Sequence, residues 1–405
     1  MTSRLLLFFL LFAGLQLYPC TTVLVSGKAT PDGRPLLLKN RDSDEIRNRL
    51  SFFQDGKYTY YGLVNAKDIQ GKEVWGGFNS TGFAIINSAS YNLKLNDTSK
   101  LADREGIIMK LALQRCATLD DFEQLLQKLP KPLGVEANFG VIDASGGAAY
   151  YETDNYTFRK FDVNDPAVAP DGYLIRTNYS VCGLAGDGMG HIRFETTVDY
   201  LRQQFDDQKL DCNDLINELP RLLKHSLTRT DLSTIMPKNR MDTTFVWFQD
   251  YIPRMSTASA IMIQGIREGI PANQNTMWVV NGFPLTSVVI PVWFDPEGNL
   301  PAILVGDENG LSRLSEYSLQ LKDFMCPAEK GIGSKYLNLA LLHNAEGSGF
   351  RQILEKVENQ IIADGIALQQ TMYREGYKPD AVKAYYDQLS TNLESVYQSV
   401  LKSMK

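Results

Sequence analysis

Strand-like and helix-like segments occupy separate blocks of this chain, and their order restricts the folds open to it. The strand-like blocks cover residues 21–26, 36–39, 58–87, 138–152 and 256–294, and the helix-like blocks cover residues 103–116, 119–129, 191–204, 212–226 and 335–402. Runs of strands followed by runs of helices are typical of an α+β layered sandwich, whereas a βαβ repeat alternates single elements. We therefore expect one α+β domain over residues 20–405, with its core over roughly 20–295 and a mainly helical C-terminal extension over 335–405.

Turn and capping residues support these boundaries. The stretch 31–33 reads Pro-Asp-Gly, a turn signal, so the chain starts with a hairpin whose first residue is Cys20. Thr118 with Asp121 resembles a capping box at the start of a helix. The glycine-rich stretch 183–190 predicts a flexible loop over a site, and it lacks the Lys-Ser/Thr pair of a phosphate loop.

The first 19 residues differ from the rest of the chain. Arg4 precedes an unbroken apolar run from Leu5 to Ala13. That run is shorter than the about 20 apolar residues that span a bilayer, and it has the length of the hydrophobic region of a secretory signal. We interpret residues 1–19 as a signal peptide or propeptide rather than a buried helix. We expect an exported mature protein without stable membrane insertion.

The composition disfavours several classes of partner. The formal net charge of -6 argues against a nucleic-acid partner, because nucleic-acid-binding surfaces carry a basic excess. There are five cysteines, three histidines and no C-x-x-C pair, so we expect neither a metal nor another cofactor. Export would permit disulfides, yet five is an odd number, so at least one thiol stays free or pairs between chains. Its position after the leader singles out Cys20 as the candidate free, reactive thiol. An oligomer is compatible with the sequence.

Cys20 could supply a complete nucleophile if processing made it the first residue. The thiolate is the reactive form of cysteine, so the thiol needs a base. A free α-amine has a pKa of about 7.7–8.0 and can accept that proton near neutral pH. One residue then carries both nucleophile and base, and no histidine is required.

The junction before Cys20 leaves more than one interpretation open. It reads Leu17-Tyr18-Pro19 and lacks the small residues that signal peptidase prefers. Cleavage upstream, for example after Ala13, would leave a short propeptide, which Cys20 could remove by attacking the preceding carbonyl. Leu17 also suits a lipoprotein anchored at Cys20 with a non-catalytic binding domain, although Pro19 fits that motif poorly. A serine hydrolase is disfavoured because no G-x-S-x-G motif is present.

Several short motifs occur together in an order typical of one group of enzymes. They are Cys20-Thr21-Thr22, Asn40-Arg41-Asp42, Gly77-Phe78-Asn79, Asn138-Phe139-Gly140, Arg176-Thr177-Asn178 and Ser256-Thr257-Ala258-Ser259. Over about residues 20–290 the chain resembles N-terminal-nucleophile (Ntn) hydrolases of two families. One is the choloylglycine hydrolase family, with bile salt hydrolases and penicillin V acylases. The other is the acyl-coenzyme A:6-aminopenicillanic acid acyltransferase family.

The resemblance implies both a fold and a reaction. The fold is a four-layer αββα sandwich. The reaction is cleavage of a linear amide C–N bond in a small N-acyl substrate, through an acyl-thioester on Cys20 with its α-amine as base. An acyltransferase that uses the same acyl-enzyme is the alternative, and the acyl and amine groups stay open.

The resemblance also implies roles for residues near the N-terminus. Cys20 fills the nucleophile position, and Asp42 fills that of an aspartate that orients the amino group of the cysteine. The families have an arginine near Lys39, so the cation here is either Lys39 or Arg41, and Arg41 could instead pair with Asp44. A cation at this place would lower the pKa of the thiol.

Three further residues match later positions of the same families. Asn87 falls near the position of an oxyanion donor, and Asn178 matches another. Amide donors aimed at a developing oxyanion contribute about 2.7–4 kcal/mol each. Arg193 falls in a late arginine position, which implies contact with the substrate.

Overall fold

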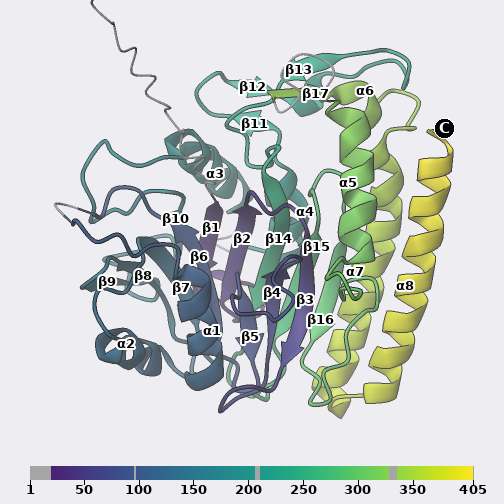
Figure 1. Cartoon of the computed structure of the whole chain (residues 1–405). Coiled ribbons are helices and arrows are strands. Elements are labelled where there is room, and N and C mark those ends of the chain that lie inside the picture. Colours follow the sequence, from purple (N-terminus) through teal and green to yellow (C-terminus); the bar gives the residue numbers. More distant parts are fainter. Residues whose placement is uncertain (1–19, 95–96, 206–209, 328–334, 405) are drawn as a thin grey trace, which may run out of the picture.

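The computed structural model describes residues 20–94, 97–205, 210–327 and 335–404. The leader expected over residues 1–19 lies outside these ranges. Among the described residues, no helix combines the length and apolarity needed to cross a bilayer. Two antiparallel sheets form the centre of the molecule, and helices lie against their outer faces (Figure 1).

The two sheets differ in how their strands follow the chain. One has six strands in the order β10-β1-β2-β14-β15-β16, and the other has seven strands, β3 to β9, in sequence order. The six are β1 (Thr21–Val25), β2 (Leu36–Asp42), β10 (Tyr173–Arg176), β14 (Thr257–Gln264), β15 (Thr276–Asn281) and β16 (Val289–Trp293). The seven are β3 (Asn48–Phe53), β4 (Tyr60–Asn65), β5 (Gly77–Asn79), β6 (Ala84–Ala89), β7 (Ala137–Ile142), β8 (Ala148–Thr153) and β9 (Phe158–Asp162). Two small ribbons pair β11 (Lys224–His225) with β12 (Thr230–Asp231) and β13 (Phe245–Trp247) with β17 (Tyr336–Asn338).

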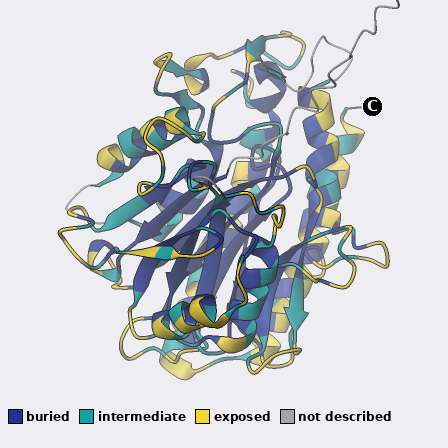
Figure 2. Ribbon diagram, turned by 60° about the vertical axis from the view of Figure 1, so that its left-hand side comes forward, coloured by how far each residue is buried: buried dark blue, intermediate teal, exposed yellow. Residues whose placement is uncertain are grey.

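Side chains alternate between the two faces of the six-stranded sheet. In β2, Leu37 belongs to the core between the sheets, whereas Leu36 and Leu38 belong to the core beneath the helices. In β1, Leu24 lies between the sheets and Val23 lies on the helix side. Both faces are therefore apolar, and Figure 2 shows the sheets buried over most of their length. Odd-numbered residues of β2 and even-numbered residues of β1 point toward the seven-stranded sheet.

Helices form the two outer layers. α1 (Glu105–Arg115) and α2 (Leu119–Lys128) pack on the seven-stranded sheet. α3 (His191–Gln204), α4 (Cys212–Glu218) and α7 (Phe350–Glu375) pack on the six-stranded sheet. α5 (Arg313–Met325), α6 (Leu339–Leu342) and α8 (Pro379–Lys402) pack around α7 and one another (Figure 1). The 3-10 turns are η1 (Gly27–Ala29), η2 (Leu219–Arg221) and η3 (Leu232–Thr234).

This architecture confirms the α+β, four-layer αββα sandwich expected from the sequence. The helical region expected over residues 335–405 is present, and α7 forms part of the outer layer on the six-stranded sheet. The capping box of Thr118 and Asp121 is also confirmed.

Two helix predictions need correction. The helix predicted at 212–226 is too long, because α4 ends at Glu218, two residues before Pro220. Pro220 has no N–H to donate to the main-chain oxygen of Ile216, so the α-helical hydrogen bonds cannot continue, and the chain goes on as a 3-10 turn and then β11. α5 has no counterpart in the sequence prediction, although Ser312 caps its N-terminus in the usual way.

Candidate active site

Cys20 directly precedes β1 and is held between two neighbouring strands. Thr22 pairs with Lys39 of β2 on one side and with Arg176 of β10 on the other. Two residues earlier in the same registers, Cys20 lies opposite Arg41 of β2 and opposite Asn178, which follows β10. Cys20 shares the inner face with Thr22, whose Oγ1 accepts a 2.9 Å hydrogen bond from the Tyr150 hydroxyl on the seven-stranded sheet. The thiol, on a residue only 7% exposed, therefore points into the space between the sheets.

Asp42, at the end of β2, lies beside Cys20. The Cys20 Sγ is 3.8 Å from the main-chain oxygen of Asp42. The Asp42 carboxylate accepts a 2.5 Å hydrogen bond from Thr257 Oγ1 and pairs with Arg254. Both partners come from β14 or the residues before it, and Thr257 lies directly opposite Asp42 in the sheet. Arg254 is a site residue that the sequence analysis missed.

Lys39 is buried on the inner face of β2. Its Nζ donates to Asn87 Oδ1 at 2.6 Å and to the main-chain oxygen of Trp75 at 2.8 Å. Burial lowers the pKa of Lys39 to about 7, and the negative form of Cys20 is the strongest effect that opposes this shift. Cys20 is therefore near enough for its charge to act on Lys39.

Arg41 is held in a different way. It donates to Asn48 Oδ1 and to Asn65 Oδ1, both at 2.8 Å, and its guanidinium lies 4.9 Å from the ring centre of Trp75. The suggested pairing with Asp44 is wrong, because these two amide oxygens accept its hydrogen bonds and Asp44 is exposed. Burial lowers the pKa of Arg41 to about 10, again opposed most strongly by Cys20.

The two candidate oxyanion donors are each fixed by a cation. Asn87 Oδ1 accepts from Lys39, which turns the amide nitrogen of Asn87 away from Lys39. Asn178 Oδ1 accepts from Arg193 Nη2 at 3.0 Å, and its Nδ2 donates to the main-chain oxygen of Ala89 at 2.8 Å. An amide nitrogen has two hydrogens, so Asn178 can hold Ala89 and still offer one N–H.

Arg193, on the first turn of α3, has no exposed surface. Its Nη1 donates to the main-chain oxygen of Cys20 at 2.6 Å and to Thr21 Oγ1 at 2.7 Å. Both Nη atoms of Arg193 are therefore bonded to Cys20, Thr21 and Asn178, which favours a role within the protein over the substrate contact that the resemblance implies. Burial lowers the pKa of Arg193 to about 9, and the charge of Arg254 lowers it further.

The remaining cysteines and the acidic groups suggest no second centre. All five cysteines are free, with Cys116 and Cys326 buried, Cys212 half-buried and Cys182 exposed. Within the described ranges, no three His, Cys, Asp or Glu side chains are grouped so that they could hold a metal.

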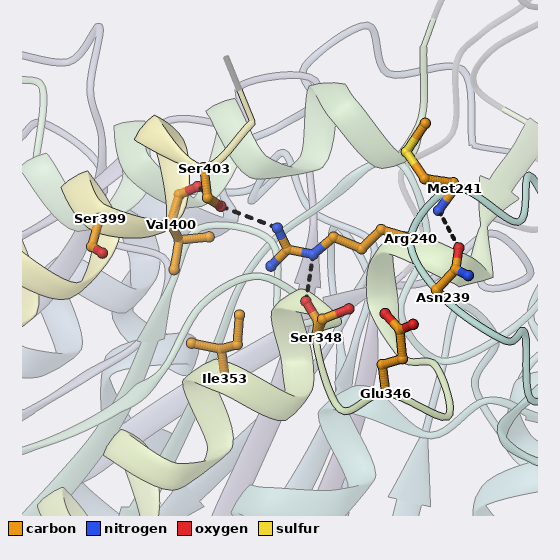
Figure 3. Close-up of a pocket in the computed structure, with 9 residues that line it drawn as sticks. All are labelled: Asn239, Arg240, Met241, Glu346, Ser348, Ile353, Ser399, Val400 and Ser403. Atoms are coloured by element: carbon orange, nitrogen blue, oxygen red, sulfur yellow. Dashed lines mark hydrogen bonds between the residues drawn. The ribbon is translucent and has the colours of Figure 1, made fainter.

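A hollow of about 680 Å³ lies elsewhere, between the loop at 239–241 and the end of α8 (Figure 3). Arg240 crosses it and donates to the main-chain oxygen of Ser348 at 2.6 Å and to Ser403 Oγ at 3.1 Å. The lining residues are Asn239, Arg240, Met241, Glu346, Ser348, Ile353, Ser399, Val400 and Ser403. They include neither a cysteine nor any site residue expected from the sequence. We therefore place the candidate active site at Cys20.

Comparisons with known proteins give distant likenesses. No family model and no curated protein matches the chain. A solved N-acylethanolamine-hydrolyzing acid amidase ortholog of Caenorhabditis elegans is 16% identical with a TM-score of 0.35, over 47% of this chain and 82% of that one. A mutant conjugated bile acid hydrolase from Clostridium perfringens is 12% identical with a TM-score of 0.40, over 68% and 92%. Penicillin V acylase from Agrobacterium tumefaciens is 11% identical with a TM-score of 0.33, over 68% and 86%.

Two of these three structures belong to the kinds of enzyme named from the sequence, a bile acid hydrolase and a penicillin V acylase. Likenesses this distant assign no activity to the present chain, so any assignment must come from the contacts around Cys20.

Proposed function

We propose that the protein is a cysteine amidase that cleaves the C–N bond of an N-acyl substrate with Cys20. The observation that carries the proposal is the set of buried cations around the Cys20 thiol. Lys39, Arg41 and Arg193 are buried around it, and their hydrogen bonds end on neutral oxygens of amide, hydroxyl and main-chain groups. Buried positive charge that makes no direct ion pair with a carboxylate favours an anion at the centre of the group, as a thiolate or an oxyanion.

The reaction follows from a free amino terminus at Cys20. The α-amine accepts the thiol proton, and the sulfur forms a bond to the acyl carbon. The oxyanion that develops can take N–H donors from Asn87 and Asn178, each worth about 2.7–4 kcal/mol when well placed. The C–N bond then breaks as the α-ammonium returns the proton to the leaving amine. Water hydrolyses the thioester in a second cycle of the same proton transfers.

The burial of Cys20 favours this proposal over a lipid anchor. A lipid anchor would have to extend from the surface into a bilayer, whereas the Cys20 Sγ lies 3.8 Å from the main-chain oxygen of Asp42 on a residue only 7% exposed. Export and removal of residues 1–19 belong to the same proposal, because the α-amine of Cys20 is free only after that segment has been cut off.

Substitution of Cys20 tests the proposal most directly. Cys20→Ala should abolish turnover of a panel of N-acyl aminocoumarins, from acetyl to palmitoyl, while thermal unfolding stays cooperative. Cys20→Ser should retain little activity, because a hydroxyl is a poorer nucleophile than a thiolate. Cys182→Ala, which removes an exposed thiol, is the matched control and should keep full activity.

Intact-mass measurement of the active protein completes the test. The mature chain should begin at Cys20 with an unmodified amino group and should gain the mass of the acyl group during turnover. Wild-type activity in Cys20→Ala, or full activity in a chain with a blocked first residue, would disprove the amidase mechanism.

A further inference from the structure

We propose that Arg193 is a positioning residue that fixes Asn178 relative to Cys20, and that Gly190 leaves the space in which its guanidinium lies. The inference rests on the proposed function, because it assigns a purpose to the spacing between nucleophile and oxyanion donor. Arg193 would not touch the substrate. It would act by holding the two groups that do.

The guanidinium bridges two strands at the point where their pairing ends. Cys20 and Asn178 would be the second pair beyond Thr22–Arg176 in the antiparallel register, but both lie outside the strands β1 and β10. Arg193 Nη1 donates to the main-chain oxygen of Cys20 at 2.6 Å, and its Nη2 donates to Asn178 Oδ1 at 3.0 Å. A guanidinium is planar and rigid, so the two bonds fix the distance between their acceptors.

The main chain holds Asn178 from a second direction. Asn178 and Met189 exchange two main-chain hydrogen bonds, of 3.2 and 3.1 Å, in an isolated antiparallel bridge. Met189 is the next-to-last residue of the glycine-rich stretch 183–190, which leads directly into α3 and Arg193. The stretch therefore does more than cover a site, since it connects Asn178 to the arginine that orients its side chain.

Gly190 makes room for this arrangement. Its φ is +86°, a conformation that residues with a side chain rarely adopt, and a Cβ there would lie 2.2 Å from Arg193 Nη2 and 3.0 Å from Thr177 Cβ. Gly186, in the same stretch, has a φ of +80° and nothing within 4 Å of the same position. The two glycines share a left-handed backbone conformation, in which an alanine would be strained, but of the two only Gly190 makes space for the guanidinium.

This placement matters for one kind of reaction at Cys20 and not for another. Attack on an acyl carbon creates an oxyanion, which needs the Asn178 N–H at a set distance from the sulfur. A misplacement of about 1 Å can cost about 100-fold in rate. Alkylation of the thiol by iodoacetamide creates no oxyanion, so it should depend little on where Asn178 lies.

The experiment compares these two reactions in Arg193→Lys, Gly190→Ala and Gly186→Ala. Acylation is measured as the p-nitrophenolate burst from p-nitrophenyl hexanoate, and alkylation as the mass gain from iodoacetamide at Cys20. Arg193→Lys keeps the positive charge but loses the planar guanidinium that bonds two acceptors at once. It should slow the burst about 100-fold, while the alkylation rate stays within about threefold of wild type. Gly190→Ala should resemble it, and Gly186→Ala should keep the wild-type burst rate.

Each other outcome has a definite meaning. A wild-type burst rate in folded Arg193→Lys and Gly190→Ala, or an equal loss of burst and alkylation, overturns the positioning role. Equal losses in Gly190→Ala and Gly186→Ala assign the effect to backbone strain and also overturn it. If Arg193→Lys does not fold, the two glycine variants still decide. A wild-type burst that persists in Cys20→Ala refutes the proposed function itself.

Discussion

Two groups of cations inside this molecule differ in whether a carboxylate forms an ion pair with them. Between the six-stranded sheet and α7, Glu358 pairs with Arg221 at 2.6 Å and with Arg351, and it accepts a 2.6 Å hydrogen bond from the main-chain N–H of Val289. Burial alone would raise the pKa of Glu358, but the two arginines hold it below its usual value. Both oxygens of the Glu358 carboxylate therefore have partners within the protein.

The group around Cys20 lacks such a partner for most of its charges. Lys39, Arg41 and Arg193 donate to neutral oxygens, and burial lowers their pKa values to about 7, 10 and 9. Asp42 is the carboxylate of the site, and it pairs with Arg254 instead. Each cation of the first group has an ion pair with a carboxylate, and this group should contribute to stability. The second leaves positive charge for reacting groups and should contribute to rate.

The largest expected effect is on stability, in Glu358→Gln. The amide can still accept from Val289, but it leaves the buried Arg221 and the half-buried Arg351 without a countercharge. Removal of one partner from a buried ion pair costs about 3–5 kcal/mol of unfolding free energy. Urea unfolding measures that loss, and kcat of the folded fraction should match wild type. A fall in kcat without loss of stability would contradict the contrast between the two groups.

A smaller effect on stability is expected from Glu105→Gln, and it depends on pH. Burial raises the pKa of Glu105 to about 7, partly opposed by main-chain hydrogen bonds, and the charge of Glu105 acts on Lys39. The folded protein then holds this proton more tightly than the unfolded chain does. The stabilisation that Glu105 gives is complete below its ordinary pKa of 4.5 and is lost as pH rises through about 7.

Glutamine keeps the shape of the side chain without titrating. From about pH 4.5 to about pH 8, the unfolding free energy of Glu105→Gln should therefore rise relative to wild type by up to about 3 kcal/mol. Urea unfolding at three pH values across this range measures the difference. A difference between Glu105→Gln and wild type that is constant with pH would mean that Glu105 is ionised throughout and partly neutralises Lys39.

The parts of the site that the sequence predicts are those joined by short stretches of chain. Cys20 and Asp42 belong to one hairpin, so the turn between them fixes their register. Arg254 reaches Asp42 through the pairing of β14 with β2, a contact across 212 residues that no local pattern reveals. Thr257 was the available indication, because it belongs to a recognised motif and lies opposite Asp42.

The role of Arg193 shows a different limit of the sequence. A resemblance carries over a residue type but not its exposure, and an arginine is usually at the surface. The helical period of α3 did contain the information, because Thr197, Tyr200 and Leu201 lie four, seven and eight residues on and are all buried. The layers of the fold were predictable for the same reason, since periodicity marks which faces are covered.

The smallest of these effects, on rate alone, is expected in Lys39→Met. Loss of Nζ releases Asn87 Oδ1, so the amide of Asn87 can turn away from the oxyanion, and it removes a buried positive charge near Cys20. We expect kcat for an N-acyl aminocoumarin to fall about 100-fold, equivalent to about 2.7 kcal/mol, with little change in KM. Lys39→Arg, which keeps the charge and a donor, should recover part of the loss.

A double-mutant cycle with Asn87→Ala separates the two contributions of Lys39. If Lys39 acts mainly by holding Asn87, Lys39→Met should cost much less in the Asn87→Ala background, because contacting residues are not additive. If the losses add in full, Lys39 acts on the thiolate instead, and alkylation of Cys20 by iodoacetamide should slow in Lys39→Met. An unchanged kcat in Lys39→Met would remove the distinction between the two groups of buried charge, because a cation without a carboxylate would then have no effect on rate.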